Sequence, residues 1–237
     1  MNQKKFIFAA YFESKMAKNK KQVNTEEFEE LTSTENFIDQ YKKPLLIGGG
    51  AIIAIVLGII GYQKLISEPH ELESKDAYWN AFYEFEKDSL NLAVNGNENF
   101  AGMEEVAADY SGTSGGNIAN YTLGIAAMER GEFDNAVGYF DACDFEDIVM
   151  GSMVIGLKGD CHIEMDDYST AADLFEEAAD REANEFTTPM YLKKAGLAYE
   201  ALGETDKALA AYQKIKDNWE NSEEAADIDK YITRAQN

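Results

Sequence analysis

Cys161 and His162 are the residue types of a thiol nucleophile and its base, and they are adjacent in the sequence. Neighbouring residues of an α-helix point about 100° apart, so adjacency alone does not let these two form an ion pair. The sequence has no glycine-rich phosphate loop, no HExxH zinc motif and no nucleophile elbow, and two histidines are too few for most metal or acid–base sites. We therefore expect no enzymatic activity, no cofactor, no metal site and no small-molecule substrate.

Other reactive groups have simple structural interpretations. The pairs Asp166-Asp167 and Glu176-Glu177 are typical of solvated helix faces rather than acid–base dyads. Cys143 and Cys161 fall on apolar faces of expected helices, which favours a role as small core residues. A disulfide between them is the alternative in an oxidising compartment.

An uncharged stretch begins at Pro44 and runs for twenty residues, PLLIGGGAIIAIVLGIIGYQ. As a helix it is about 30 Å long, the thickness of the hydrocarbon core of a bilayer. No small-x-small cleavage pattern follows it, which indicates an uncleaved anchor. We expect a transmembrane helix over 44–66 and a linker over 67–75.

Small residues form a stripe along this expected span, with spacings of four, four and three, at Gly50, Ala54, Gly58 and Gly61. Such stripes allow another transmembrane helix to approach closely, so we predict packing there. The alternative is that glycine is simply common in membrane spans.

Lysines are concentrated before the span: eight precede it, whereas the residues after Lys64 contain 12 basic and 37 acidic side chains. The positive-inside rule predicts a cytoplasmic N-terminal tail over 1–43 and a C-terminal domain on the other side of the membrane. Met16, which opens the lysine-rich MAKNKK, is a candidate for the true start. The acidic domain repels nucleic acid and anionic lipid headgroups, so we expect neither as a direct ligand.

A repeat follows the span in a region that is expected to be helical almost throughout, without any strand. A glycine is followed by an alanine after twelve residues and by an aromatic residue after four more, and the starting glycines are 35 and 37 residues apart. This spacing is close to that of a helix-turn-helix unit of about 34 residues. The three sets are Gly124, Ala136 and Phe140; Gly159, Ala171 and Phe175; and Gly196, Ala208 and Tyr212.

The glycine and alanine suit a close crossing of the two helices in a unit, and the aromatic residue is expected to fill the gap between neighbouring units. Gly131 and Gly203 stand where the first helix of a unit ends, and Asp166 replaces glycine in the middle copy. The stretches LGIAAMERGEFDNAVGYFDAC and AGLAYEALGETDKALAAYQKI resemble tetratricopeptide repeats. The expected fold is all-α: a single N-terminal transmembrane helix followed by a tetratricopeptide-repeat α-solenoid.

The expected array occupies residues 76–221 and ends in a C-terminal capping helix over 222–237 that opens on Ser222. Its expected units are a degenerate one over 76–110, with helices Tyr78 to Leu92 and Phe100 to Tyr110, and three regular ones over 117–150, 152–188 and 189–221.

Repeat arrays of this kind bind proteins along a concave surface lined by their first helices. That surface is predicted to be mixed apolar and acidic, which fits a hydrophobic peptide, a basic segment or a folded neighbour. The predicted residues are Tyr121, Ile125, Met128, Asp160, Ile163, Lys193, Leu197 and Glu200.

The whole plan, from the charged tail through the span to the array ending in NEFTTPMYLKKAGLAYEALGETDKALAAYQKIKDNWENSEEAADIDKYITRA, resembles the membrane-anchored tetratricopeptide proteins of the YfgM type, in the versions found in Bacteroidetes-like bacteria. The resemblance implies a single-pass protein of the bacterial inner membrane with a periplasmic array. It also implies an ancillary subunit of the SecYEG translocon that works with exported chains and a PpiD-type periplasmic foldase. The alternative is a scaffold subunit of another cell-envelope machine, in envelope assembly, division, gliding or specialised secretion.

Overall fold

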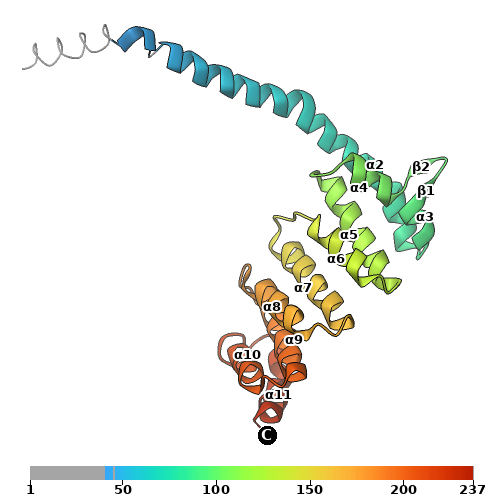
Figure 1. The fold of residues 1–237 in the computed structure, drawn as a ribbon, viewed down its shortest axis with the longest axis vertical. Coiled ribbons are helices and arrows are strands. Elements are labelled where there is room, and N and C mark those ends of the chain that lie inside the picture. The colour runs from blue at the N-terminus through green and yellow to red at the C-terminus, as the bar shows by residue number, and fades with distance from the viewer. Residues whose placement is uncertain (1–40, 45, 237) are drawn as a thin grey trace, which may run out of the picture. The chain divides into compact units, whose positions relative to one another are not determined.

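The computed structural model describes residues 41–44 and 46–236 (Figure 1). The chain divides into two compact units, Met1–Leu65 and Ile66–Asn237. Residues 1–40 of the predicted cytoplasmic tail (1–43), with the candidate start at Met16, lie outside the described residues.

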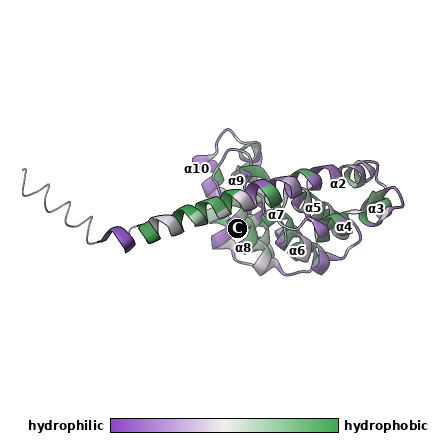
Figure 2. Cartoon of the chain, turned by 90° about the horizontal axis from the view of Figure 1, so that it is seen from above, coloured by the Kyte–Doolittle hydropathy of each residue, from purple (hydrophilic) through white to green (hydrophobic). Residues whose placement is uncertain are grey.

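The described part of the first unit is helical over residues 41–44 and 46–62. It belongs to a helix, Tyr41–Glu86, that is long and apolar enough to cross a membrane by length and composition. Green, hydrophobic residues predominate along this segment in Figure 2. Its large apolar side chains are exposed, among them Leu46, Ile47, Ile52, Ile53, Ile55, Leu57 and Ile59.

A π-helical stretch, η1 (Gln63–Ser67), leads into α2 (Glu68–Glu86). Residues 67–75, which we expected to be a linker, are therefore mostly part of a helix. Pro69 lies in the first turn after the π-helical stretch, so the N–H that proline lacks is missing where the regular α-helical hydrogen-bond ladder is already interrupted.

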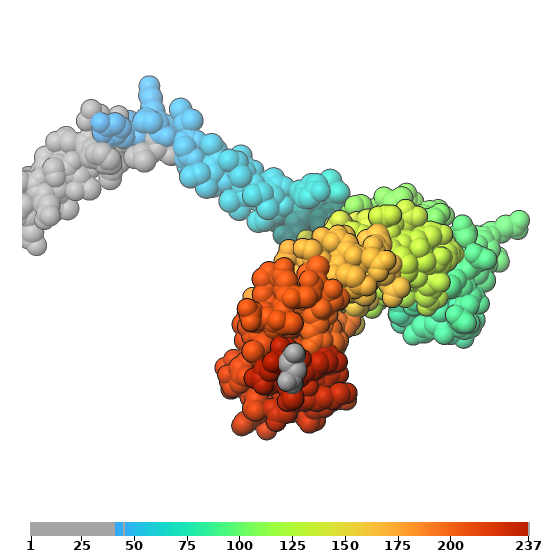
Figure 3. Space-filling model, turned by 60° about the horizontal axis from the view of Figure 1, so that its bottom comes forward, coloured from blue at the N-terminus to red at the C-terminus, as the bar shows by residue number. Residues whose placement is uncertain are grey.

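Three regular helix pairs follow one another in the second unit (Figure 1), and their colours succeed each other in order along the space-filling view of Figure 3. The second helix of each pair packs against the first helix of the next pair. The pairs are α5 (Ser114–Glu129) with α6 (Phe133–Asp141), α7 (Ile148–Glu164) with α8 (Tyr168–Asp180), and α9 (Thr187–Leu202) with α10 (Thr205–Asn218).

The turns inside these three pairs and the turn after α2 share one backbone conformation, which provides a common register for the repeats. A single residue, here called the turn residue, has a positive φ, and the N–H that follows it donates to the carbonyl five residues earlier at 2.9 Å. This is the geometry of a Schellman cap, which satisfies carbonyls at the end of the first helix. The turn residues are Asp88 (φ 63°), Gly131 (φ 72°), Asp166 (φ 58°) and Gly203 (φ 77°).

The first repeat departs from our expectation. After Asp88 the chain forms α3 (Leu90–Asn95), a two-stranded hairpin of β1 (Gly96–Asn97) and β2 (Phe100–Ala101), and then α4 (Met103–Asp109). The expectation of no strand was therefore wrong, and the helix expected from Phe100 begins at Met103.

Two glycines explain the hairpin. Gly96 has a φ of +68°, and a Cβ on Gly102 would lie 2.3 Å from the carbonyl oxygen of Val94, so only glycine fits this close approach of backbone to backbone. The strands pair with Gly96 opposite Ala101.

The glycine–aromatic pattern of the sequence corresponds to direct packing inside each unit. A Cβ on Gly124 would lie 2.4 Å from the ring of Phe140, and the same relation joins Gly159 to Phe175 and Gly196 to Tyr212. The ring thus lies over the glycine of its own unit. Phe175 also stacks on Tyr191 of the next unit, with ring centroids 6.3 Å apart, which matches the expected role between units.

The C-terminal end of the array is covered by a short 3₁₀ helix, η2 (Glu224–Asp227), and by α11 (Ile228–Ala235). Ile228 and Ile232 are buried in the core cluster of the last repeat. The hydroxyl of Ser222 accepts the N–H of Ala225 at 3.2 Å, so the cap expected at Ser222 begins a 3₁₀ turn instead of an α-helix.

Candidate protein-binding surface

The N-terminus of α5, the first helix of the first regular repeat, is held in position by contacts with α2. The carboxylate of Glu71 on α2 accepts the backbone N–H of Ser114 at 3.0 Å and also the hydroxyl of Ser114. The next N–H, that of Gly115, donates to the hydroxyl of Ser74 at 3.2 Å. These bonds satisfy donors that a helix leaves unpaired at its start. The two bonds from Ser114 lower the pKa of Glu71, chiefly the one from its hydroxyl.

The residues predicted to line the binding surface share one register. They stand ten, six or three residues before a turn residue, and so they lie along one side of their helices. We call this set the first-helix row. It comprises Tyr121, Ile125 and Met128 on α5; Asp160 and Ile163 on α7, with Gly156 at the remaining position; and Lys193, Leu197 and Glu200 on α9.

The start of this row on α2 was not predicted from the sequence. With Asp88 as turn residue, the same three positions on α2 are Tyr78, Phe82 and Phe85. Their rings lie in succession, with centroids 6.1 Å apart for Tyr78 and Phe82 and 6.3 Å apart for Phe82 and Phe85. The signal that identifies them is an aspartate in the place of a turn glycine, as at Asp166.

The N-terminal half of the row is apolar and anchored in the core. The ring of Tyr121 lies 6.3 Å from those of Phe140 and Phe145, and burial raises the pKa of its hydroxyl. Ile125 and Met128 are half-buried against the same core cluster. Only part of each side chain is therefore available to a ligand.

The C-terminal half of the row is charged, and its charges join neighbouring repeats. Each of three ion pairs links residues 34 positions apart, one repeat length. The pairs are Lys194 Nζ to Asp160 Oδ2 at 2.7 Å, Lys193 Nζ to Asp227 Oδ1 at 2.7 Å, and Arg234 Nε to Glu200 Oε1 at 3.0 Å.

The pair of Lys193 and Asp227 changes both pKa values. Burial lowers the pKa of Lys193, but the bond to Asp227 and the attraction of nearby acidic groups together outweigh it and raise the pKa overall. The pKa of Asp227 falls, chiefly because it accepts from Lys193. A ligand that used these charges would have to compete with the neighbouring repeat. Leu197, by contrast, is an exposed apolar side chain of this half.

The residues with possible reactivity are placed unfavourably for catalysis. Cys161 is buried, and burial raises the pKa of its thiol to about 11; burial also raises the pKa of Cys143 to about 12. His162 Nδ1 lies 3.2 Å from Asp167 Oδ2, so its ring contacts a helix-capping carboxylate. No cluster of three or more His, Cys, Asp or Glu side chains suited to a metal ion occurs among the residues described by the structure.

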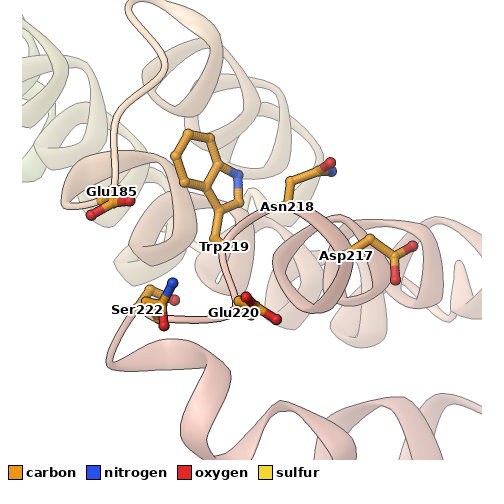
Figure 4. Close-up of a pocket in the computed structure, with 7 residues that line it drawn as sticks. Glu185, Asp217, Asn218, Trp219, Glu220 and Ser222 are labelled. Atoms are coloured by element: carbon orange, nitrogen blue, oxygen red, sulfur yellow. The ribbon is translucent and has the colours of Figure 1, made fainter.

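A shallow pocket lies where α10 ends, with a volume of about 170 Å³ (Figure 4). Trp219 stands between acidic and amide side chains there, and the volume is below the roughly 300 Å³ at which pockets for small organic ligands begin. The pocket does not provide a convincing small-molecule site. Its lining is Glu185, Asp217, Asn218, Trp219, Glu220, Asn221 and Ser222.

Comparison with known proteins identifies one part of the chain. Residues 157–223 match the tetratricopeptide repeat family, a range that covers the C-terminal part of α7 from Leu157, all of α8, α9 and α10, and the turn into η2. The chain therefore contains tetratricopeptide repeats. Each such repeat is a pair of helices, which agrees with the helix pairs of the structure. No curated protein matches the sequence.

Proposed function

We propose that this protein is a non-enzymatic, membrane-anchored scaffold that binds other proteins through the first-helix row. The observation that carries the proposal is this row itself, an apolar stretch from Tyr78 to Met128 continued by exposed Leu197 on stacked tetratricopeptide helices. Helical repeat arrays use such continuous surfaces to bind partners.

Anchoring is supported by the exposed apolar helix over 46–62 and by the lysines that precede it. The positive-inside rule then favours a cytoplasmic N-terminus and repeats on the other side of the membrane. The resemblance to YfgM-type proteins implies that this membrane is a bacterial inner membrane and that the repeats are periplasmic. Gly50, Gly58 and Gly61 have open space where a Cβ would stand, so a second transmembrane helix has room to approach at this stripe.

The partner class follows from the similarity of the whole plan to YfgM-type proteins. On that basis the scaffold is an ancillary subunit of a SecYEG-type translocon that links exported chains to a PpiD-type periplasmic foldase. The acidic array, with 37 acidic and 12 basic residues after Lys64, suits basic or apolar segments of such partners. A scaffold subunit of another envelope machine is the second candidate, since it requires the same anchor and array.

The experiment is extraction of the native membrane with mild detergent, followed by mass spectrometry of the proteins that co-purify with the full chain. Recovery of SecY-type channel subunits together with a periplasmic foldase supports the translocon assignment. Recovery of subunits of a different envelope machine instead supports the second candidate. Recovery of no partner contradicts a scaffold role.

Two leucines of α9 provide a matched pair of variants for this experiment. Leu197 is 40% exposed and Leu202 is 38% exposed, and five residues place them about 140° apart around the helix. Leu197→Asp should remove the partner from the purified complex, whereas Leu202→Asp should leave it. Equal recovery with both variants would show that the partner does not use the first-helix row.

A further inference from the structure

One face of each first helix packs against the preceding repeat. The residues twelve and five positions before the turn residue mark this face, here called the rear face. In the three regular repeats these residues are almost completely buried: Ala119 (0%) and Ala126 (1%) on α5, Val154 (6%) and Cys161 (0%) on α7, and Tyr191 (3%) and Ala198 (1%) on α9.

In each regular repeat, helices of the preceding unit bury the rear face. Ala119 and Ala126 share a core cluster with Met103 and Val106 of α4, and Cys161 shares one with Phe140 of α6. On α9, Tyr191 stacks on Phe175 of α8. In the three regular repeats, the occupant of the rear face is therefore a helix.

Among the described residues of the second unit, no preceding helix buries the rear face of α2. Its two marker residues are Asp76 and Tyr83, and Tyr83 is 56% exposed where the equivalent residues are at most 1% exposed. Trp79, three residues after Asp76 on the same side, is 62% exposed, although its equivalent on α5, Thr122, is fully buried. Leu72 lies about two helical turns before Trp79 on the same side of α2 and is 64% exposed.

We propose that the rear face of α2, formed by Leu72, Asp76, Trp79 and Tyr83, is a docking surface for a basic amphipathic helix of another protein. Such a helix takes the place that a preceding repeat takes at α5, α7 and α9. Within the described residues Asp76 makes no ion pair, so its carboxylate is available to a lysine or arginine of that helix. Aromatic side chains are the residues that most often dominate binding energy at such contacts.

A second copy of this chain is a poorer occupant. The C-terminal end, which would have to supply the helix in head-to-tail stacking, is closed by α11, whose exposed residues include Asp229, Lys230 and Thr233. Face-to-face packing of two copies would bring two strongly acidic domains together. Charge complementarity therefore favours a basic partner.

The test is photocross-linking in native membranes with the full chain, with benzoylphenylalanine in place of Trp79 or Tyr83. Phe186, an aromatic residue that is 67% exposed outside this face, is the matched control position. The expected result is a cross-link from 79 and 83, absent from 186, to a peptide that lies in a helix of another protein and contains lysine or arginine. Cross-links to lipid, to a second copy or to residues 1–40 of the same chain would each overturn the proposal, as would no cross-link.

Two further variants separate this surface from the first-helix row. Asp76→Lys should reduce the cross-link from position 83 by roughly tenfold, because the reversed charge repels a basic helix. Tyr83→Ala should reduce the cross-link from position 79 by roughly thirtyfold, as expected for loss of a central aromatic contact. An unchanged yield in either variant contradicts the proposal.

The inference rests on the proposed scaffold role but uses a different surface. Leu197→Asp should therefore leave the cross-link from position 83 intact. If Leu197→Asp changes neither the recovery of the partner nor the cross-link from position 83, the result contradicts the first-helix row as a binding surface. It does not contradict the docking surface on α2. Loss of the cross-link on Leu197→Asp would show that the two surfaces are one site, and would overturn the separate docking face.

Discussion

The ring of Phe140 lies so close over Gly124 that a Cβ on the glycine would stand 2.4 Å from Cε1 of the ring. The same contact recurs between Gly159 and Phe175. Real Cβ atoms do not approach other heavy atoms so closely, so the contact requires glycine as long as the ring keeps its place. It therefore sets how closely the two helices of a regular repeat approach each other.

Gly124→Ala should destabilise the protein by about 1 to 3 kcal/mol through overpacking against Phe140, despite the higher helix propensity of alanine. Gly138→Ala is the control, because Gly138 lies in α6 with open space where a Cβ would stand. That variant should gain about 1 kcal/mol from propensity alone. Thermal unfolding of both variants measures the two effects, and equal shifts would contradict the packing assignment.

Asp166→Gly should stabilise the protein by about 0.5 to 1 kcal/mol, because glycine adopts a positive φ more readily than aspartate does. Gly131→Ala should be destabilising by about 1 kcal/mol, since Gly131 has a φ of 72° and no neighbour near its Cβ position. Chemical denaturation gives both values. A loss of stability in Asp166→Gly would mean that the bond from the hydroxyl of Tyr168 to Asp166 outweighs the backbone term.

Cys161 and Cys143 should react slowly with an alkylating reagent near pH 8 in the folded protein. Burial raises their pKa values to about 11 and about 12, so little thiolate is present, and both should react at the ordinary rate after unfolding. Mass spectrometry of modified peptides with and without denaturant makes the comparison. Fast modification of Cys161 in the folded state would revive a reactive-thiol role.

Asp227→Asn should lower the melting temperature at neutral pH and have no such effect in acid. The pKa of Asp227 is lowered from its ordinary value of 3.8, chiefly by the bond from Lys193. A carboxylate whose pKa is lower in the folded than in the unfolded protein stabilises the fold at pH values above the unfolded-state pKa. This stabilisation is lost as the pH falls through the folded-state pKa. The melting temperatures of the unmodified protein and of the Asp227→Asn variant should thus differ at neutral pH and converge well below pH 3.8.

Lys193→Met provides the matched control for that pair, because it removes the partner of the same ion pair. The double variant with Asp227→Asn should lose little more than either single variant, as expected for two residues that act through one contact. Fully additive losses would show that Lys193 and Asp227 stabilise the fold independently.

Ile55→Lys should reduce stable membrane integration, since a lysine at the centre of a span adds roughly 2.5 to 3.5 kcal/mol to insertion. Ile66→Lys, at the end of the expected span, should have little effect because a terminal lysine reaches the interface. Alkaline extraction of membranes distinguishes bound from released protein. Normal retention of the Ile55→Lys protein would speak against the span.

The regular repeats could be predicted because local and short-range rules govern them. A close helix crossing requires glycine and alanine, so Gly196, Ala208 and Tyr212 already mark a helix pair in the sequence, and Gly203 marks its turn. The first repeat could not be predicted in the same way, since Asp88 replaces a turn glycine and two glycines create the Gly96–Ala101 hairpin through backbone contacts.

The sequence by itself determined the apolar helix, the acidic array and the repeat spacing, because length, charge and periodicity are properties of the chain alone. Only the tertiary structure decided which side chains remain available. Glu200 is engaged by Arg234 from one repeat further on, and His162 contacts Asp167 instead of its neighbour Cys161. Tyr83 is exposed where Ala126 is buried, because burial of a helix face depends on whether another helix precedes it in space.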